Sequence, residues 1–305
     1  MIRGTHPPRT RPALLAVVAT ALASLAATCG EPTLNSNFAL QVAVTAGDFD
    51  DVAAPFKRGD IAHDVFEGII SNATWDEDFN PGGVALKVED LFIGASGAGQ
   101  LGSYGAVFVG SGTRGFGGRQ YNGLDPDNTL ISDERVVDNT LRYVSSGDTL
   151  VVTDWAYELV EAGWPEMIEW AGDEMTPDGT GWANLDAAQM GMIDRITAEV
   201  SDAELAQEIG PSMAVDFPYS NFAVIESVSD DVTVYVRGDV AYRPDELSEP
   251  IELTDVPLLV GFDHGDGRVL FSTFHIDAQN PALMDTLIET LVGRFEVENT
   301  NVQVQ

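Results

Sequence analysis

The sequence predicts an α/β fold in which a mostly parallel sheet is covered by helices on both faces. Short continuous apolar runs at Ala106–Val109 and Thr149–Thr153 are typical of strands buried on both faces. Between them, Val136–Val144 has the apolar spacing of a helix, and Gly147 follows as its stop. Because strands and helices alternate along the chain, a largely parallel sheet is favoured.

The remaining early elements are assigned from apolar spacing in the same way. We expect a strand at Leu40–Thr45, a helix at Ile61–Asn72, and a strand alone or a strand followed by a helix at Val84–Phe92. Asp154 directly follows the buried run at 149–153. It is therefore the expected N-cap of the next helix.

The last third of the chain returns to short apolar runs. Strands are expected at Ala223–Ser227, Val232–Val236, Pro257–Phe262 and Arg268–Phe274. Glycine and aspartate at 263–267 predict a tight hairpin between the last two strands. A helix at Pro281–Phe295, with leucines on one stripe, closes the domain.

The segment 163–221 departs from this alternation. It contains Trp164, Trp170 and Trp182, several glycines and prolines, and one helical stretch near Ala187–Ala198. We interpret it as an insertion packed on the main sheet, within a single α/β domain that spans 40–295. The three tryptophans either line a surface for a glycan or peptide, or pack the insertion onto its domain.

The N-terminus predicts export. Arginines without any acid are followed by the apolar run Ala13–Ala27, which is typical of a secretory signal peptide at residues 1–28. Leu25–Cys29 resembles a bacterial lipobox, in which the cysteine is lipidated and anchors the protein to a membrane. The alternative is cleavage near Ala21–Ala23, which leaves Cys29 as an unmodified thiol. Residues 29–39 then form a tether, and 296–305 a flexible tail.

Composition excludes several classes of protein. With 15 Lys and Arg against 49 Asp and Glu, the formal net charge is −34, which excludes a nucleic-acid partner. A single cysteine excludes a disulfide framework and a cysteine-rich metal cluster. The acidic loop at 47–51, with His63 and Asp64, either binds a divalent cation through oxygens or is simply solvated. We favour the solvated loop and expect no metal and no cofactor.

Three segments, in chain order, resemble class I glutamine amidotransferases. Gly105–Gly112 combines a buried strand with a glycine loop, and Leu150–Ala156 combines a strand with the start of a helix. Phe274–Asp277 reads Phe-His-Ile-Asp at the end of a late strand. The resemblance covers residues 41–160 and 257–295, about half of the chain.

This resemblance implies an oxyanion hole, a nucleophile and a catalytic histidine at the three places. The backbone amides of Gly110, Ser111 and Gly112, with Arg114 nearby, would bind an anionic ligand; the alternative is a loop whose glycines only satisfy backbone geometry. Asp154 stands where the family has its nucleophilic cysteine, so glutaminase chemistry is not expected. The resemblance is closer to ThuA-like proteins, which share the fold without that cysteine.

His275 and Asp277 remain as a pair at the end of the late strand. Either His275 is a general base oriented by Asp277, with Asp154 as a carboxylate nucleophile or acid, or these residues only stabilise the fold. The first hypothesis is therefore a non-catalytic, exported protein, anchored through Cys29 at the outer membrane or cell surface, that binds an unidentified ligand or envelope protein. The alternative is an extracytoplasmic hydrolase that uses His275, Asp277 and Asp154, with or without a metal.

Overall fold

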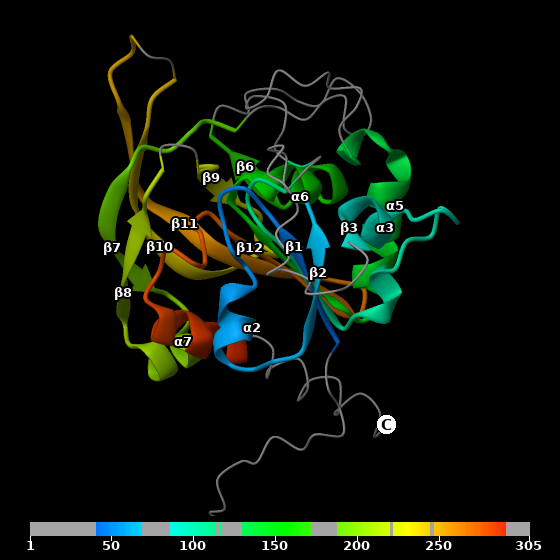
Figure 1. Ribbon diagram of the computed structural model, residues 1–305. Helices are drawn as coiled ribbons and strands as arrows, with labels where there is room; N and C mark the ends of the chain where they lie inside the picture. The colour runs from blue at the N-terminus through cyan, green and yellow to red at the C-terminus, as the bar shows by residue number, and fades with distance from the viewer. Residues whose placement is uncertain are drawn as a thin grey trace, which may run out of the picture. The chain divides into compact units, whose positions relative to one another are not determined.

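The computed structural model describes residues 41–68, 86–113, 116, 130–171, 188–219, 222–244 and 247–290. These residues all belong to one compact unit (Figure 1). The predicted signal peptide and tether, Cys29, Arg114, Trp182 and the predicted tail lie outside the described residues. None of the described helices is long and apolar enough to cross a membrane.

Ten strands form one mixed sheet, in the order β3-β2-β1-β4-β5-β12-β11-β10-β7-β8. Five of the nine pairings, from β3 to β12, are parallel, and the four from β12 to β8 are antiparallel. The fold is therefore α/β with a mostly parallel sheet, as the sequence predicts. The strands are β1 (Val42–Ala46), β2 (His63–Glu67), β3 (Leu86–Lys87), β4 (Ala106–Val109), β5 (Thr149–Thr153), β7 (Asp194–Val200), β8 (Ser212–Phe217), β10 (Thr233–Tyr242), β11 (Ile251–His264) and β12 (Gly267–Ser272).

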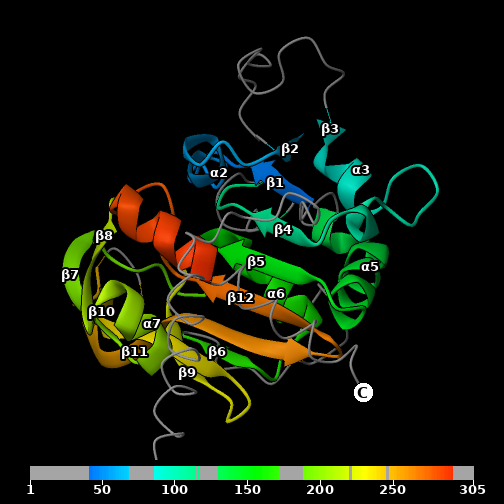
Figure 2. The same ribbon diagram turned by 90° about the horizontal axis from the view of Figure 1, so that it is seen from below.

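Helices cover both faces of the parallel half (Figure 2). One face packs against α3 (Val88–Phe92), α5 (Glu134–Ser145) and α6 (Tyr157–Gly163); the other packs against α2 (Ala54–Arg58) and the helix at 281–290. Successive side chains of a strand point to opposite faces, so β4 supplies both cores: Val107 and Val109 enter one, Ala106 and Phe108 the other. This double burial explains the continuous apolar runs.

In the described part of 163–221, β7 and β8 extend the main sheet itself, with α7 (Ala203–Ile209) between them. The helix predicted near 187–198 is wrong. Burial along β7 alternates with period two, so the cross-strand pairs with β8 and β10 decide the conformation.

Two tryptophans of this segment are core residues. Trp164 packs edge-on against Phe262, and Trp170 against Phe271, and both indoles are buried. They come from the region of β6 (Ile168–Trp170), which pairs with β9 (Ile225–Val228) in a small second sheet. These two therefore pack the segment onto the domain and offer no binding surface.

The helix predicted at 61–72 is also wrong in its described part. Residues 63–67 form β2, which pairs in parallel with β1 in register from Val42–His63 to Ala46–Glu67. Apolar spacing over such a short stretch fits either a helix or a strand. Pairing with the edge of β1 that β4 leaves free makes this segment a strand.

Candidate functional site

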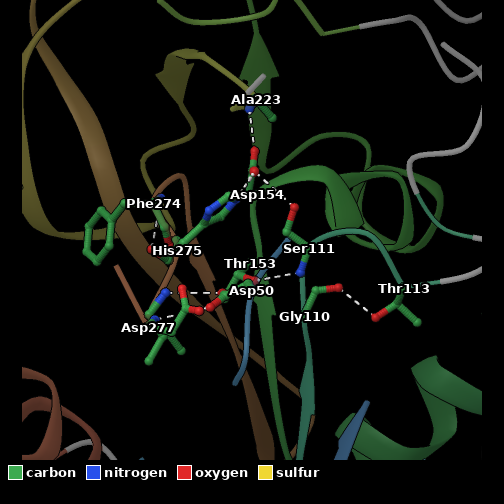
Figure 3. A network of polar contacts seen from close by, with 12 residues as sticks. Asp50, Gly110, Ser111, Thr113, Thr153, Asp154, Ala223, Phe274, His275 and Asp277 are labelled. Atoms are coloured by element: carbon green, nitrogen blue, oxygen red, sulfur yellow. Dashed lines mark hydrogen bonds and ion pairs between the residues drawn. The ribbon is translucent and has the colours of Figure 1, made fainter. Parts of the chain in front are cut away.

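The polar centre of the molecule lies at the carboxyl ends of three neighbouring strands. β4, β5 and β12 are adjacent in the sheet and parallel, so the residues that follow them meet at one edge. Ser111 follows β4, Asp154 follows β5, and His275 comes shortly after β12 (Figure 3). The structure thus brings together three of the residues that the sequence singles out.

Asp154 is the hub of this cluster. Its Oδ2 accepts a hydrogen bond from Ser111 Oγ at 3.0 Å and lies 2.6 Å from His275 Nε2. Its Oδ1 accepts the backbone N–H of Ala223 at 2.8 Å. Both oxygens of the carboxylate are therefore occupied, and the side chain is completely buried.

The backbone explains why Asp154 points inward. Its φ is +47°, a left-handed conformation that aspartate tolerates better than most residues, and it turns the chain sharply from β5 into a 3₁₀ turn at Asp154–Ala156. The side chain caps neither this turn nor α6, so the predicted N-cap role is wrong. The sharp turn carries the carboxylate across the strand ends toward Ser111 and His275.

His275 pairs with Asp154, where the sequence suggested Asp277. The backbone N–H of Asp277 donates to Asp50 Oδ1 at 3.1 Å, and its exposed side chain acts on the His275 ring only through its charge. Burial lowers the pKa of His275, but the hydrogen bond to Asp154 and the surrounding negative charges outweigh this and raise the pKa above its ordinary 6.5. The contact between His275 Nε2 and the Asp154 carboxylate is therefore a buried pair whose charged form the surrounding carboxylates favour.

The amides proposed for anion binding are largely occupied. Gly110 N–H donates to Thr45 Oγ1 and Ser111 N–H to Thr153 Oγ1, each at 3.0 Å. The Ser111 carbonyl accepts the Phe49 N–H at 3.3 Å. Two of the three expected donors therefore serve the fold, and Arg114 lies outside the described residues.

Asp50, from the acidic loop at 47–51 that the sequence predicts to be solvated or cation-binding, is a further member of the cluster. Its buried carboxylate accepts hydrogen bonds from Thr153 Oγ1 and from the N–H groups of Ile276 and Asp277, and so ties the β12 loop to β5. Burial, opposed by the charge of His275, raises the pKa of Asp50 to about 7. Its place just after β1, among the strands whose ends carry the site, was the available signal.

The cluster is closed to solvent. Ser111 and Asp154 are completely buried, and His275 is only 3% exposed. The ring of Tyr219 lies 5.5 Å from that of His275, centre to centre, and Phe49 follows at 6.3 Å from Tyr219. His275 Nδ1 is buried and makes no hydrogen bond within the described part of the chain.

Metal ligands are not grouped here. Across the described ranges, no group of three or more histidine, cysteine, aspartate or glutamate side chains is arranged to hold a metal ion. Asp50, which belongs to the acidic loop considered for cation binding, directs both oxygens to donors of the protein itself. What the geometry provides is a set of polar groups that hydrogen-bond to one another and to the backbone, with His275 Nδ1 as the exception.

Comparison with known proteins adds a likeness of fold. No family model and no curated protein matches the chain. Similar solved structures include a catalytic mutant of Gan42B, a GH42 β-galactosidase from G. stearothermophilus (14% identity, TM-score 0.41, covering 85% of this chain and 30% of that one). Others are the cytoplasmic protein STM3548 from Salmonella typhimurium (11%, 0.40, 83% and 97%) and a protein called ThuA-like from Parabacteroides merdae (12%, 0.37, 80% and 83%).

A ThuA-like protein is thus among the structures with a similar arrangement of strands and helices. The chain spans only 30% of the length of the β-galactosidases that it matches. At these identities and TM-scores the likeness supports no conclusion about activity.

Proposed function

We propose that this protein is a non-catalytic binding protein of the cell envelope, exported and held at the membrane through a lipid on Cys29. The observation that carries the non-catalytic part is the state of Asp154, which stands at the nucleophile position, fully buried, with both oxygens hydrogen-bonded. A nucleophile must reach a substrate atom, and this carboxylate is fully buried with protein groups hydrogen-bonded to both of its oxygens.

The neighbouring groups support the same proposal. Acyl transfer needs backbone donors directed at a developing oxyanion, whereas the amides of Gly110 and Ser111 are taken by threonine hydroxyls. Neither Ser111 nor His275 is accessible. The cluster joins the ends of three strands, which is a structural role, and the function then resides in recognition by another surface.

Export and anchoring rest on the sequence alone. A basic start, an apolar run and one cysteine at the end of that run form the pattern of a lipoprotein signal. The direct measurement is the mass of the protein expressed in a bacterial host with lipoprotein processing. A diacylglyceryl adduct on an N-terminal Cys29 supports the anchor, and a fragment cleaved elsewhere with a free Cys29 thiol contradicts it.

A hydrolase remains the second candidate, because one observation favours it. His275 Nδ1 is a buried nitrogen without a partner, next to an aspartate in a strained turn, and such features concentrate at active sites. In this alternative Asp154 attacks and His275 moves the proton.

One experiment separates the two candidates. The full-length protein and its Asp154→Asn and His275→Asn variants are assayed against ester, amide, glycoside and phosphate chromogenic substrates, with His264→Asn as a matched histidine control. We expect the same background rate in all four proteins. Turnover by the wild type and the control that is lost in correctly folded Asp154→Asn and His275→Asn would contradict the binding proposal.

A further inference from the structure

The outer edge of β8 is the end of the main sheet. β8 is the last strand in the order, with β7 on one side (Figure 2). On its other side, no described strand pairs with it. An edge strand presents backbone N–H and C=O groups in the pattern that another extended chain can pair with.

Two contacts fix which residues of β8 face outward. Val200 N–H donates to the carbonyl of Pro211, so residue 211 faces β7. The side-chain amide of Gln279 pairs with the backbone of Asp216 in both directions, N–H to Oε1 and Nε2 to the carbonyl, each at 2.9 Å. Asp216 therefore faces the outer edge.

Backbone groups alternate along a strand in an antiparallel pair. Because Asp216 faces outward and Pro211 inward, the N–H and C=O groups of Ser212 and Ala214 also face outward. The register between β7 and β8 agrees: Ala214 lies opposite Thr197 and Ser212 opposite Glu199, two and four residues along β8 from the Arg195–Asp216 pair. Within the described chain, Ser212 and Ala214 form no backbone–backbone hydrogen bond on this side.

A groove accompanies this edge. A cavity of about 500 Å³ lies between β8 and the helix at 281–290, and Ser212, Ala214, Asp216, Leu283 and Thr286 are among its lining residues. Ser212 and Ala214 are exposed and have small side chains, so a neighbouring backbone could approach closely. None of residues 212–217 is lysine or proline, the residues that commonly protect edge strands.

The side chain of Gln279 already pairs with one outward-facing residue of β8, Asp216. Its amide directs one of its two N–H donors and its oxygen at Asp216 in the geometry of a peptide group, and it occupies the position of one residue of a neighbouring strand there. It is 4% exposed and also donates to the carbonyl of His275 at 2.9 Å. One peptide-like partner is thus already in place beside Asp216, and the next two outward-facing residues along β8 are Ala214 and Ser212.

We infer that the outer edge of β8 binds an extended, lysine- or arginine-bearing segment of a partner protein, which adds a strand beside Ser212 and Ala214. The backbone pattern selects an extended chain, and charge selects the partner class. The chain carries a formal charge of −34; in the groove Arg195 Nε lies 3.6 Å from Asp216 Oδ2, and Glu208 adds a further negative charge. A second copy would bring a further −34. This inference rests on the proposed function, whose partner it specifies.

The test uses the full-length protein and a synthetic peptide of alternating lysine and valine, with fluorescence anisotropy as the readout. Ala214→Pro removes one outward N–H, and Ala214→Val is the matched control that retains it. We expect Ala214→Pro to weaken binding at least tenfold and Ala214→Val to change it by less than about twofold. Equal binding by a folded Ala214→Pro variant would overturn the proposal.

Two peptide controls do not depend on how the variant folds. A peptide with N-methyl groups on alternate amides cannot form the ladder and should lose binding to the wild type, and so should a peptide with glutamate in place of lysine. If the N-methylated peptide binds as well as its parent, strand addition is wrong. If the glutamate peptide binds as well as the lysine peptide, the charge assigned to the partner is wrong.

Two further experiments test whether a second copy of the chain, or the chain's own C-terminal end, occupies the edge instead; the first is sedimentation velocity. We expect a monomer. A dimer that Ala214→Pro dissociates would assign the edge to a second copy, and peptide binding that appears only after removal of residues 291–305 would assign it to the chain's own end; either result overturns the proposal. Asp154-dependent hydrolysis would defeat the proposed function without changing these binding results, so the two failures are distinguishable.

Discussion

The parallel and antiparallel halves of the sheet treat their polar groups in opposite ways. At the ends of β4, β5 and β12, the side chains of Asp50, Ser111, Thr153, Asp154 and His275 are buried and hydrogen-bonded to one another or to the backbone, and within this group only His275 Nδ1 lacks a partner. At β8, backbone groups of Ser212 and Ala214 face a groove. The comparison teaches that, in our proposal, the buried polar cluster and the surface that recognises a partner are different parts of the same sheet.

The largest effect should come from removing the hub of the cluster. Asp154→Ala leaves the Ser111 hydroxyl, the Nε2 of His275 and the Ala223 N–H without their common partner in a buried place. We expect the free energy of unfolding in urea to fall by about 3–5 kcal/mol. Asp263→Ala, which breaks the partly exposed ion pair with Arg268, is the control and should cost less than about 1 kcal/mol. Equal losses would mean that the cluster is not structural.

The second effect concerns pH. Asp50 and His275 both have raised pKa values in the folded protein, so the folded state holds their protons more tightly than the unfolded state does. Stability should therefore fall as pH rises from about 4 through 7, with Asp50 contributing about 2–4 kcal/mol of the change. The measurement is urea unfolding at several pH values for the wild type and Asp50→Asn. The variant should lose most of the slope, and an unchanged slope would exclude Asp50 as its source.

A smaller effect should follow from the loop after β4. Gly112 has φ +78°, and an added Cβ would lie 2.7 Å from the Phe49 ring and 2.8 Å from the Asp48 nitrogen. We expect Gly112→Ala to cost about 1–3 kcal/mol in thermal or urea unfolding. Gly102→Ala, with nothing within 4 Å of the added carbon, should be close to neutral. A neutral Gly112→Ala would show that this loop adapts.

The smallest effect should come from the edge. Since the Ala214 N–H lies outside the ladder with β7, Ala214→Pro should change the stability of the free protein by less than about 1 kcal/mol. Val215→Pro removes a ladder bond and should cost clearly more. Hydrogen exchange of β7 amides provides the measurement. If Ala214→Pro is the more damaging substitution, the assigned alternation of β8 is wrong.

Sequence reasoning was strongest where burial on both faces leaves no alternative. The runs at β4 and β5, the helix α5 and the hairpin between β11 and β12 were predicted, because continuous apolar stretches and turn residues are local signals. β2 and β7 were predicted as helices, because their short patterns fit both periods and pairing with distant strands decides between them.

The site was likewise predicted only in part. Strand ends placed Ser111, Asp154 and His275 at one edge, since parallel strands share the direction of their carboxyl ends. The exchange of partners, in which Asp154 replaces Asp277 beside His275, depends on the left-handed turn at Asp154. Asp50 was assigned to solvent because an acidic loop usually is solvated, and only the folded chain shows its three donors.

β12 is the strand where the two halves meet, and this has a consequence for the order of folding. It pairs with β11 through a tight turn but with β5 across more than a hundred residues, Arg268 opposite Thr149. Closing a short loop costs less entropy than closing a long one. We therefore expect the antiparallel hairpins to form first and β5 to pair with β12 afterwards. Asp154 and His275 come into contact only at that docking step. We therefore expect the contact between Asp154 and His275 to form late in folding. In pulsed hydrogen exchange, the amides around these two residues should become protected after those of β10 and β11.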